Sequence, residues 1–337
     1  MELNYPEFHD RFAAFLRSLE GRRVVVISHA RPDGDCIGSQ VALTRVLRAL
    51  NIDAVAANPD PVPRRIQFAV GDTPLVHFAQ LPEGDFTAVY VDCADQGRAG
   101  DKFKNRFPAP FANIDHHVSN RGYAEHNFID VGSCATAEIL AGLFIDHHLP
   151  IDAQAAQALY TGIATDTGQF RFISTSRRTF LIAAELMARG AQPATAAVEL
   201  YERETPGKLD LLQRFLASLS YECGGRVCIG KLPDGIYQAT GTSPEDTEGL
   251  VDYARGIDGV EIGVLIEEQA GSIKGSLRAK DPAYRMDRIA AEFNGGGHAC
   301  AAGLNVKNTT LADFQVRLVA AITTQINAVD ALKKSAT

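Results

Sequence analysis

Short hydrophobic runs alternate with helical patterns over the first half of the chain. Hydrophobic residues recur at helical spacing between Phe8 and Leu19, which predicts an amphipathic helix that packs onto the following residues. Four later runs are short enough to be buried strands and lie at 24–28, 53–57, 87–91 and 111–114. Helical patterns cover about 37–50, 135–147 and 153–162. Strands that alternate with helices are typical of a parallel sheet covered on both faces, so we expect an α/β domain of this kind.

The second half of the chain has a different pattern. Helical spacing dominates from about Arg177 to Leu219, and Gly224 and Gly225 then mark a break. Three further hydrophobic runs are bounded by Gly, Asp and Pro and predict strands at 227–232, 260–267 and 273–279. Helical patterns lie near 245–255, 286–293 and 311–326. These elements predict a second, smaller α/β domain.

Length and pattern together divide the chain. A chain of 337 residues is long enough for two domains that each have a hydrophobic core. We place the first domain at 1–190, a helical linker at 191–223, the second domain at 224–330, and a frayed tail at 331–337.

The charge balance limits the partners. The formal net charge is -8, and proteins that coat duplex DNA rely on many Lys and Arg contacts to phosphates. Duplex DNA is therefore not an expected partner, and a phosphorylated substrate should be small. The first residues show neither a signal peptide nor a transit pattern, and no hydrophobic run approaches the ~20 residues of a membrane span. We expect a cytoplasmic protein without a membrane partner.

Clusters of Asp and His occur where hydrophobic runs end. The clusters are His29, Asp33 and Asp35 after VVVIS, Asp92 and Asp95 in VYVDCAD, Asp115, His116 and His117 after FANI, and Asp166 in TGIATDTGQF. Ligand-binding residues of parallel sheets gather at the carboxyl ends of the strands, so we expect the four clusters to converge at one edge. A single Asp at a strand end is usually a helix cap or a turn residue, and only the joint pattern favours a metal site.

This set of residues favours two metal ions. Carboxylates brought together repel one another and lose hydration unless a cation neutralises them. So many oxygen and imidazole ligands exceed what one structural zinc ion takes, and they fit two divalent ions that share a carboxylate. Two ions about 3.5–4 Å apart can deprotonate a bridging water and neutralise charge on a phosphoryl group, which predicts phosphoester hydrolysis. Asp and His ligands without Cys favour Mn²⁺, with Mg²⁺ and Co²⁺ as alternatives.

Five motifs occur in order along the chain, namely SHARPDGDCIGS, VDCAD, DHHVSN, TGIATDTGQF and, at 295–303, GGGHACAAG. They resemble, in the same order, the motifs of the DHH phosphoesterases and their associated DHHA1 domain. The resemblance implies a parallel-sheet DHH domain with flanking helices and a smaller α/β DHHA1 domain, joined by a helical linker.

The resemblance also implies the roles of single residues. It places one metal ion on His29, Asp33 and Asp92 and the other on Asp35, Asp92, His116 and Asp166, with Asp92 as the bridge. His117 would face the substrate phosphate as a hydrogen-bond donor or proton source. Asp92, His116 and His117 are therefore the expected catalytic residues.

The second domain offers residues that could bind substrate. The backbone N–H groups of Gly295, Gly296 and Gly297 can approach an anion closely, and His298 can donate to a phosphate or stack on a base, although a plain flexible turn is the alternative. Arg278 resembles the substrate arginine of the family and could grip a phosphate bidentately. Lys274 and Lys280 have the same strand parity as Arg278, which a solvated charge stripe explains equally well.

A second DHH tripeptide occurs at Asp146, His147 and His148. It ends a helical hydrophobic pattern and precedes Leu149-Pro150, where His complements a helix C-terminus. We interpret it as surface structure and not as a metal site.

Length and architecture most resemble the stand-alone oligoribonuclease (nanoRNase) and pAp phosphatase group of the family. The chain has no room for the additional oligonucleotide-binding domain of RecJ-type exonucleases, and its acidity disfavours tracking along a long strand. We expect a hydrolase that converts short 5′-phosphorylated oligonucleotides such as pApA and pGpG to nucleoside 5′-monophosphates. It would also convert 3′-phosphoadenosine 5′-phosphate (pAp) to AMP.

Three alternatives stay open at this point. A stand-alone cyclic di-AMP phosphodiesterase could carry the same motifs. A family II inorganic pyrophosphatase shares the chemistry of the first domain but lacks the GGGH loop. A non-catalytic nucleotide-binding protein would be expected to have lost at least one of the metal-site residues. A homodimer is implied by the resemblance alone.

Overall fold

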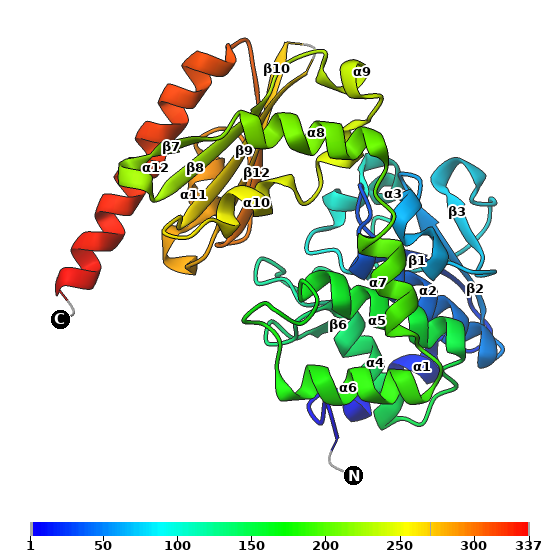
Figure 1. Cartoon of the computed structure of the whole chain (residues 1–337). Coiled ribbons are helices and arrows are strands. Elements are labelled where there is room, and N and C mark those ends of the chain that lie inside the picture. Colours follow the sequence, from blue (N-terminus) through cyan, green and yellow to red (C-terminus); the bar gives the residue numbers. More distant parts are fainter. Residues whose placement is uncertain (1–2, 270, 336–337) are drawn as a thin grey trace. The chain divides into compact units, whose positions relative to one another are not determined.

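The computed structural model describes residues 3–269 and 271–335. The chain forms two compact units, Met1–Arg203 and Glu204–Thr337 (Figure 1). The boundary between them falls inside the linker proposed at 191–223. Helix α7 (Pro193–Tyr201) belongs to the first unit, and helix α8 (Pro206–Ala217) belongs to the second.

The first unit is built on a six-stranded sheet. In spatial order the strands are β3 (Leu75–His77), β2 (Asp53–Asn58), β1 (Arg23–Ile27), β4 (Thr87–Val91), β5 (Ala112–Asp115) and β6 (His126–Ile129). All neighbouring strands pair in parallel, so their carboxyl ends lie at one edge. The expected parallel-sheet α/β fold is confirmed. Strands β3 and β6 were not predicted, because they are short and only partly buried.

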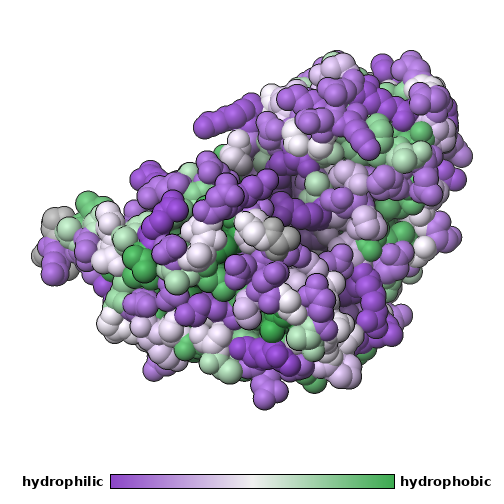
Figure 2. Space-filling model, turned by 90° about the horizontal axis from the view of Figure 1, so that it is seen from above, coloured by the Kyte–Doolittle hydropathy of each residue, from purple (hydrophilic) through white to green (hydrophobic). Residues whose placement is uncertain are grey.

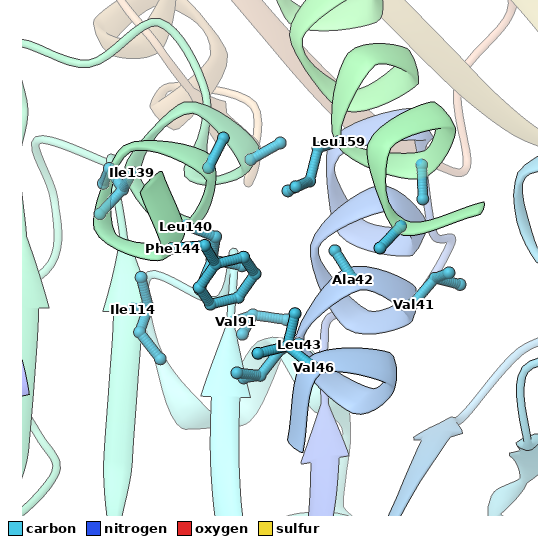
Figure 3. Close-up of a cluster of buried hydrophobic side chains, with 14 of the residues drawn as sticks. Val41, Ala42, Leu43, Val46, Val91, Ile114, Ile139, Leu140, Phe144 and Leu159 are labelled. Atoms are coloured by element: carbon cyan, nitrogen blue, oxygen red, sulfur yellow. The ribbon is translucent and has the colours of Figure 1, made fainter. Parts of the chain in front are cut away.

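Both faces of this sheet are covered. The helices of the unit are α1 (His9–Ser18), α2 (Gly34–Ala49), α3 (Asp101–Arg106), α4 (Thr136–Asp146), α5 (Ala153–Asp166), α6 (Arg177–Ala188) and α7, and its 3₁₀ turns are η1 (Arg64–Ala69), η2 (Phe78–Gln80) and η3 (Gln96–Ala99). Along β1, Val24 and Val26 lie in one hydrophobic cluster, and Val25 and Ile27 lie in another. Figure 3 shows the first cluster, where side chains of α2, α4 and α5 meet over β4 and β5.

The second unit contains a mixed sheet. In spatial order its strands are β11 (Gly296–Gly297), β12 (Ala301–Lys307), β10 (Ser272–Ala279), β9 (Ile262–Gln269), β8 (Val227–Leu232) and β7 (Ser220–Glu222). Only β8 and β9 pair in parallel among these described strands. The remaining elements are α8, η4 (Cys223–Gly225), α9 (Ile236–Thr240), η5 (Pro244–Thr247), α10 (Leu250–Gly256), η6 (Pro282–Tyr284), α11 (Met286–Ala291) and α12 (Leu311–Ser335). Helices α8, α9 and α10 pack on one hydrophobic cluster, and α11 and α12 pack on the other.

The last helix corrects the expectation of a frayed tail. Helix α12 continues to Ser335, and residues 336 and 337 lie outside the described residues. Val329 is buried in the core of the unit, Asp330 pairs with Arg226 at 2.6 Å, and Lys333 pairs with Asp281 at 2.8 Å. Ion pairs hold much of this last part of the helix, which is why hydrophobic periodicity did not reveal it.

In the face shown in Figure 2, hydrophobic residues lie among hydrophilic ones. No helix within residues 3–269 and 271–335 is long and apolar enough to cross a membrane.

Candidate metal centre

The predicted Asp and His clusters lie at the carboxyl edge of the parallel sheet. His29 follows β1, Asp92 follows β4, and His116 and His117 follow β5. Asp166 reaches the same place from a different kind of element, because it is the last residue of α5 and does not follow a strand. The expectation of four strand-end clusters is therefore wrong for Asp166, although this side chain still reaches the cluster.

Helix α2 begins inside the site. Asp33 is its N-cap and accepts a hydrogen bond from Cys36 N at 3.0 Å. Asp35 lies in the first turn and is fully buried, where its carboxylate accepts from the N–H groups of Thr136 at 2.6 Å and Ala137 at 2.8 Å. These N–H groups belong to the N-terminus of α4, where the helix dipole favours a negative charge. Two helix ends therefore fix the two carboxylates.

Glycines let α2 approach α5 closely. A Cβ atom on Gly34 would lie 2.3 Å from Thr165 Oγ1, and one on Gly38 would lie 2.3 Å from the carbonyl oxygen of Ala158. Larger residues would push the helices apart. The close approach is what brings Asp35, on α2, near Asp166, at the end of α5.

Asp92 presents its two carboxylate oxygens to different neighbours. Oδ2 lies 3.2 Å from Nε2 of His29, which is also 3.7 Å from the Asp33 carboxylate. Oδ1 lies 3.6 Å from Nε2 of His116 and accepts a hydrogen bond from Thr136 Oγ1 at 3.3 Å. One carboxylate therefore faces two groups of potential ligands.

His116 connects Asp92 to the remaining acids. Its Nε2 lies 3.4 Å from the Asp166 carboxylate and 3.9 Å from the Asp35 carboxylate. Three groups among the described residues have ligand atoms within 4.8 Å of one another, and they are His29, Asp33 and Asp92; Asp35, His116 and Asp166; and Asp92, His116 and His117. The groups overlap at Asp92 and His116.

The electrostatics of this cluster favour a bound cation. Burial raises the pKa of Asp35, and the charges of Asp92 and Asp33 raise it further. Burial and the charge of Asp35 likewise raise the pKa of Asp166. Burial acts to lower the pKa of His29, but the hydrogen bond to Asp92 and the surrounding negative charges raise it to about 9. The cluster therefore attracts positive charge, and its carboxylate and imidazole donors suit a divalent cation.

Two residues near His117 were missed by the sequence reasoning. Nδ1 of His117 lies 2.8 Å from Asp115 Oδ1, and Nη1 of Arg98 donates to Nε2 of His117 at 3.0 Å. Asp115 was noted only as part of a cluster, and Arg98 gave no signal beyond being a cation soon after Asp92. Asp95, which was noted with Asp92, caps η3 by accepting from Gly97 N at 2.7 Å.

The predicted substrate residues of the second unit lie in neighbouring strands. Arg278 on β10 pairs in register with Ala301 on β12, and the N–H of His298 donates to the carbonyl of Ala301 at 2.7 Å. The lack of a side chain at Gly295 and Gly297 allows close packing on β12, since a Cβ on either would lie within 2.4 Å of a β12 carbonyl oxygen.

The predicted substrate residues and the two nearby lysines differ in their exposure and hydrogen bonds. Burial lowers the pKa of Arg278, whose Nη1 donates to the carbonyl of Leu277 at 3.1 Å. Gly296 and His298 are exposed, and a Cβ on Gly296 would meet open space. Lys274 pairs with the buried carboxylate of Glu267 at 2.6 Å, and Lys280 donates to the carbonyl of Ile257 at 3.1 Å. Both lysines therefore have structural contacts.

The second DHH tripeptide holds the N-terminal segment. The Asp146 carboxylate accepts from the N–H groups of Asn4 and Tyr5, both at 2.9 Å. The ring of His147 stacks on His9 with the centroids 4.2 Å apart, and His148 is exposed. These contacts agree with the structural interpretation of this tripeptide.

Comparison with known proteins identifies the family. The chain has an α/β unit with Asp and His at its carboxyl edge, followed by a unit with a mixed sheet. Residues 23–163 match the DHH family, N-terminal domain, and residues 224–328 match the DHHA1 domain. The chain belongs to the DHH family.

Relatives with curated names cover most of the chain. The bifunctional oligoribonuclease and PAP phosphatase NrnA of Thermus thermophilus is 30% identical over 323 residues, which is 95% of each chain. The protein of the same name from Bacillus subtilis is 29% identical over 308 residues, covering 86% of this chain and 91% of the relative. The resemblance to the oligoribonuclease and pAp phosphatase group is thereby confirmed.

Solved structures share the fold. An exopolyphosphatase-related protein from Bacteroides fragilis has a TM-score of 0.85 at 23% identity, covering 96% of this chain and 98% of that chain. RecJ from Thermus thermophilus in complex with Mn²⁺ has a TM-score of 0.53 at 15% identity, covering 96% of this chain and 55% of that chain. At these identities the comparison shows the fold alone.

Proposed function

We propose that this protein hydrolyses short 5′-phosphorylated oligonucleotides, such as pApA and pGpG, to nucleoside 5′-monophosphates, and pAp to AMP. The observation that carries the proposal is the placement of Asp92, whose two oxygens face two separate Asp and His groups. Full-length similarity to relatives named for these two activities supports the choice of substrate.

Two divalent cations would be held by the residues of these groups. One group is His29, Asp33 and Asp92, and the other is Asp35, Asp92, His116 and Asp166. We propose Mn²⁺, with Mg²⁺ and Co²⁺ as alternatives, because the donors are oxygen and imidazole nitrogen. When bound, the cations lower the pKa of the attacking water and offset the charge that builds on the phosphoryl group.

His117 would handle the proton at this site. Asp115 orients the ring from the Nδ1 side, so Nε2, which accepts from Arg98 Nη1 at 3.0 Å in this structure, is the nitrogen that would exchange a proton once substrate is bound. Asp115 is itself held by Asn120, whose Nδ2 donates to its second oxygen at 2.6 Å. The ring is therefore positioned before substrate arrives.

The second unit would bind the nucleotide. Arg278 carries a guanidinium partly removed from water, which strengthens its attraction to a phosphate. The exposed His298, close to the exposed Gly296, would offer an imidazole to a phosphate or a base. Of the predicted glycine loop, Gly295 and Gly297 support this surface by letting β11 lie close to β12.

The test is product analysis by chromatography. The purified full chain with Mn²⁺ is offered pApA, pGpG, pAp and cyclic di-AMP in parallel, with Asp92→Ala as the catalytic control. We expect rapid release of AMP or GMP from the linear dinucleotides and of AMP from pAp, little turnover of cyclic di-AMP, and an inactive variant.

Each other outcome selects an alternative. Preferred opening of cyclic di-AMP would make the protein a cyclic-dinucleotide phosphodiesterase. Binding of metal and nucleotide without turnover of any of the four would favour a non-catalytic nucleotide-binding protein.

A further inference from the structure

Arg98 follows β4, the middle one of the three strands whose ends carry the site. It lies in η3, where its N–H donates to the carbonyl of Asp95 at 3.0 Å. Its own carbonyl accepts from the N–H of Ala30 at 2.8 Å, directly after His29. The backbone of Arg98 is therefore tied to the loop that follows β1.

The side chain of Arg98 is tied to the end of β5. Its Nη1 donates to Nε2 of His117 at 3.0 Å. Because a guanidinium can only donate, Nε2 is the acceptor, and the hydrogen of the neutral ring lies on Nδ1, which faces Asp115 at 2.8 Å. Arg98 and Asp115 thus hold His117 from opposite sides of its ring.

Arg98 retains donors for a ligand. The residue is exposed, and its guanidinium carries five N–H donors in a planar fork, of which the bond to His117 uses one. Its charge also acts on the cluster. Burial and the neighbouring carboxylates raise the pKa of Asp166, and the positive charge of Arg98 acts to lower it.

The positive charge of Arg98 can offset the negative charge that a bound phosphate adds to the site. The ionised carboxylates of the two groups are Asp33, Asp35, Asp92 and Asp166, and two divalent cations offset them. A phosphodiester then adds about one negative charge, and a phosphomonoester adds roughly 1.5 to 2. A guanidinium can bind two phosphoryl oxygens at once.

We propose that Arg98 contacts the non-bridging oxygens of the scissile phosphoryl group and favours the 3′-phosphomonoester of pAp over the phosphodiester of pApA. This inference rests on the proposed function. Arg98 turns one side of its fork to the phosphate while its backbone stays fixed between the β1 and β4 loops. The more negative the phosphoryl group, the more its hydrolysis depends on Arg98.

Kinetics of Arg98→Gln and Arg98→Lys with Mn²⁺ test this directly. For Arg98→Gln we expect kcat/KM for pAp to fall roughly 10²- to 10³-fold, as when a donor to a developing charge is removed. The loss for pApA is expected to be at least about tenfold smaller, because its phosphoryl group carries less charge. Lys should give intermediate losses, since it keeps the charge but not the fork. Arg22→Gln is the matched control, because Arg22 is an exposed arginine at the opposite end of β1 whose Nε donates to the carbonyl of Ser18.

Two further readouts separate contact from structural support. Guanidinium ions in the millimolar range should partly restore pAp hydrolysis by Arg98→Gln, whereas tetramethylammonium at equal ionic strength should not. Calorimetric titration should show unchanged Mn²⁺ binding by Arg98→Gln and weaker binding of inorganic phosphate to its metal-loaded form. The phosphate titration does not depend on turnover.

Several results would overturn the proposal. These are unchanged kinetics of Arg98→Gln, equal losses for pAp and pApA without rescue, loss of Mn²⁺ binding, or unchanged phosphate binding. If the unmodified protein hydrolyses neither substrate, the proposed function fails, and the phosphate titration then decides on Arg98 by itself.

Discussion

Asp92 has a left-handed backbone with φ of 51°, which costs a residue with a side chain about 1–3 kcal/mol. The surrounding structure sustains this conformation, because the N–H of Asp92 donates to the carbonyl of Ile114 at 3.0 Å and the residue is only 2% exposed. Glycine would adopt this backbone without strain but has no carboxylate. The strain is therefore the consequence of placing a carboxylate where its two oxygens reach both ligand groups.

Asp115 is not one of the proposed metal ligands, although it directly precedes His116 in the chain. It is fully buried, and both of its oxygens face donors, Nδ1 of His117 and Nδ2 of Asn120. A carboxylate can accept from both, whereas an amide must turn its NH₂ group toward one of them. Charge and shape at this position therefore fix which nitrogen of His117 carries the hydrogen.

We predict that Asp115→Asn lowers kcat by roughly 10²- to 10⁴-fold, the range expected when the residue that orients a catalytic histidine is changed. Mn²⁺ affinity should change little, because the ligand groups described above do not include Asp115. Steady-state kinetics and calorimetric titration of Mn²⁺ measure the two effects. Asp53→Asn is the control, since Asp53 pairs with Arg23 on the surface with its side chain 62% exposed. A variant with full kcat would contradict the orienting role.

Among the elements, the pair α2 and α5 determines the geometry of the acidic cluster. Gly34 and Gly38 on α2 and Gly162 on α5 lie where the two helices touch, and a Cβ on Gly162 would be 3.0 Å from Asp35 Oδ1. Since α2 carries Asp35 and α5 ends at Asp166, the distance between the helices sets the distance between these carboxylates. Small residues here serve the site through packing.

We predict that Gly38→Ala destabilises the first unit by about 1–3 kcal/mol, because its Cβ would meet the carbonyl oxygen of Ala158 and the helices must separate. Mn²⁺ affinity should fall as Asp35 moves away from Asp166. Denaturant unfolding and Mn²⁺ titration measure both effects. Gly256→Ala is the matched control, since no atom lies within 4 Å of its added Cβ. Equal stability of the two variants would contradict the packing argument.

The elements also show what a sequence can predict. The ends of the strands before His29, Asp92 and His116 were predictable, because a buried parallel strand reads as a hydrophobic run that stops where the ligands begin. The end of α5 was predicted near 162 and lies at Asp166, because the last turn of the helix contains the polar residues Thr165 and Asp166, which hydrophobic periodicity does not mark.

Contacts between distant segments were not predictable in this way. Arg98 and His117 come from different strand ends, and Lys274 meets Glu267 only because β10 pairs with β9. No local spacing shows such partners, since each depends on how strands are ordered in the sheet. The sequence could therefore indicate the ligands of a metal site but not the residues that orient them.

On the scale of the whole molecule, each unit has its own hydrophobic cores and its own sheet. The acidic cluster belongs to the first unit only, and Arg278 and the GGGH segment belong to the second. A ligand that binds the folded cluster stabilises the unit that contains it by mass action, and it leaves the stability of the other unit unchanged unless the two unfold together.

We therefore predict that metal removal affects the two units differently in the full chain. Scanning calorimetry in Mn²⁺ should resolve two transitions, and excess chelator should lower the midpoint of one of them. The expected loss is about 2.7 kcal/mol for each site that was held at 100 times its Kd. The affected transition should be the one that Gly38→Ala also lowers, and Asp92→Ala should abolish the difference between Mn²⁺ and chelator. Among the described residues, buried carboxylates gather around histidines only in the first unit. A chelator effect on both transitions, or on neither, would therefore contradict a metal centre confined to that unit.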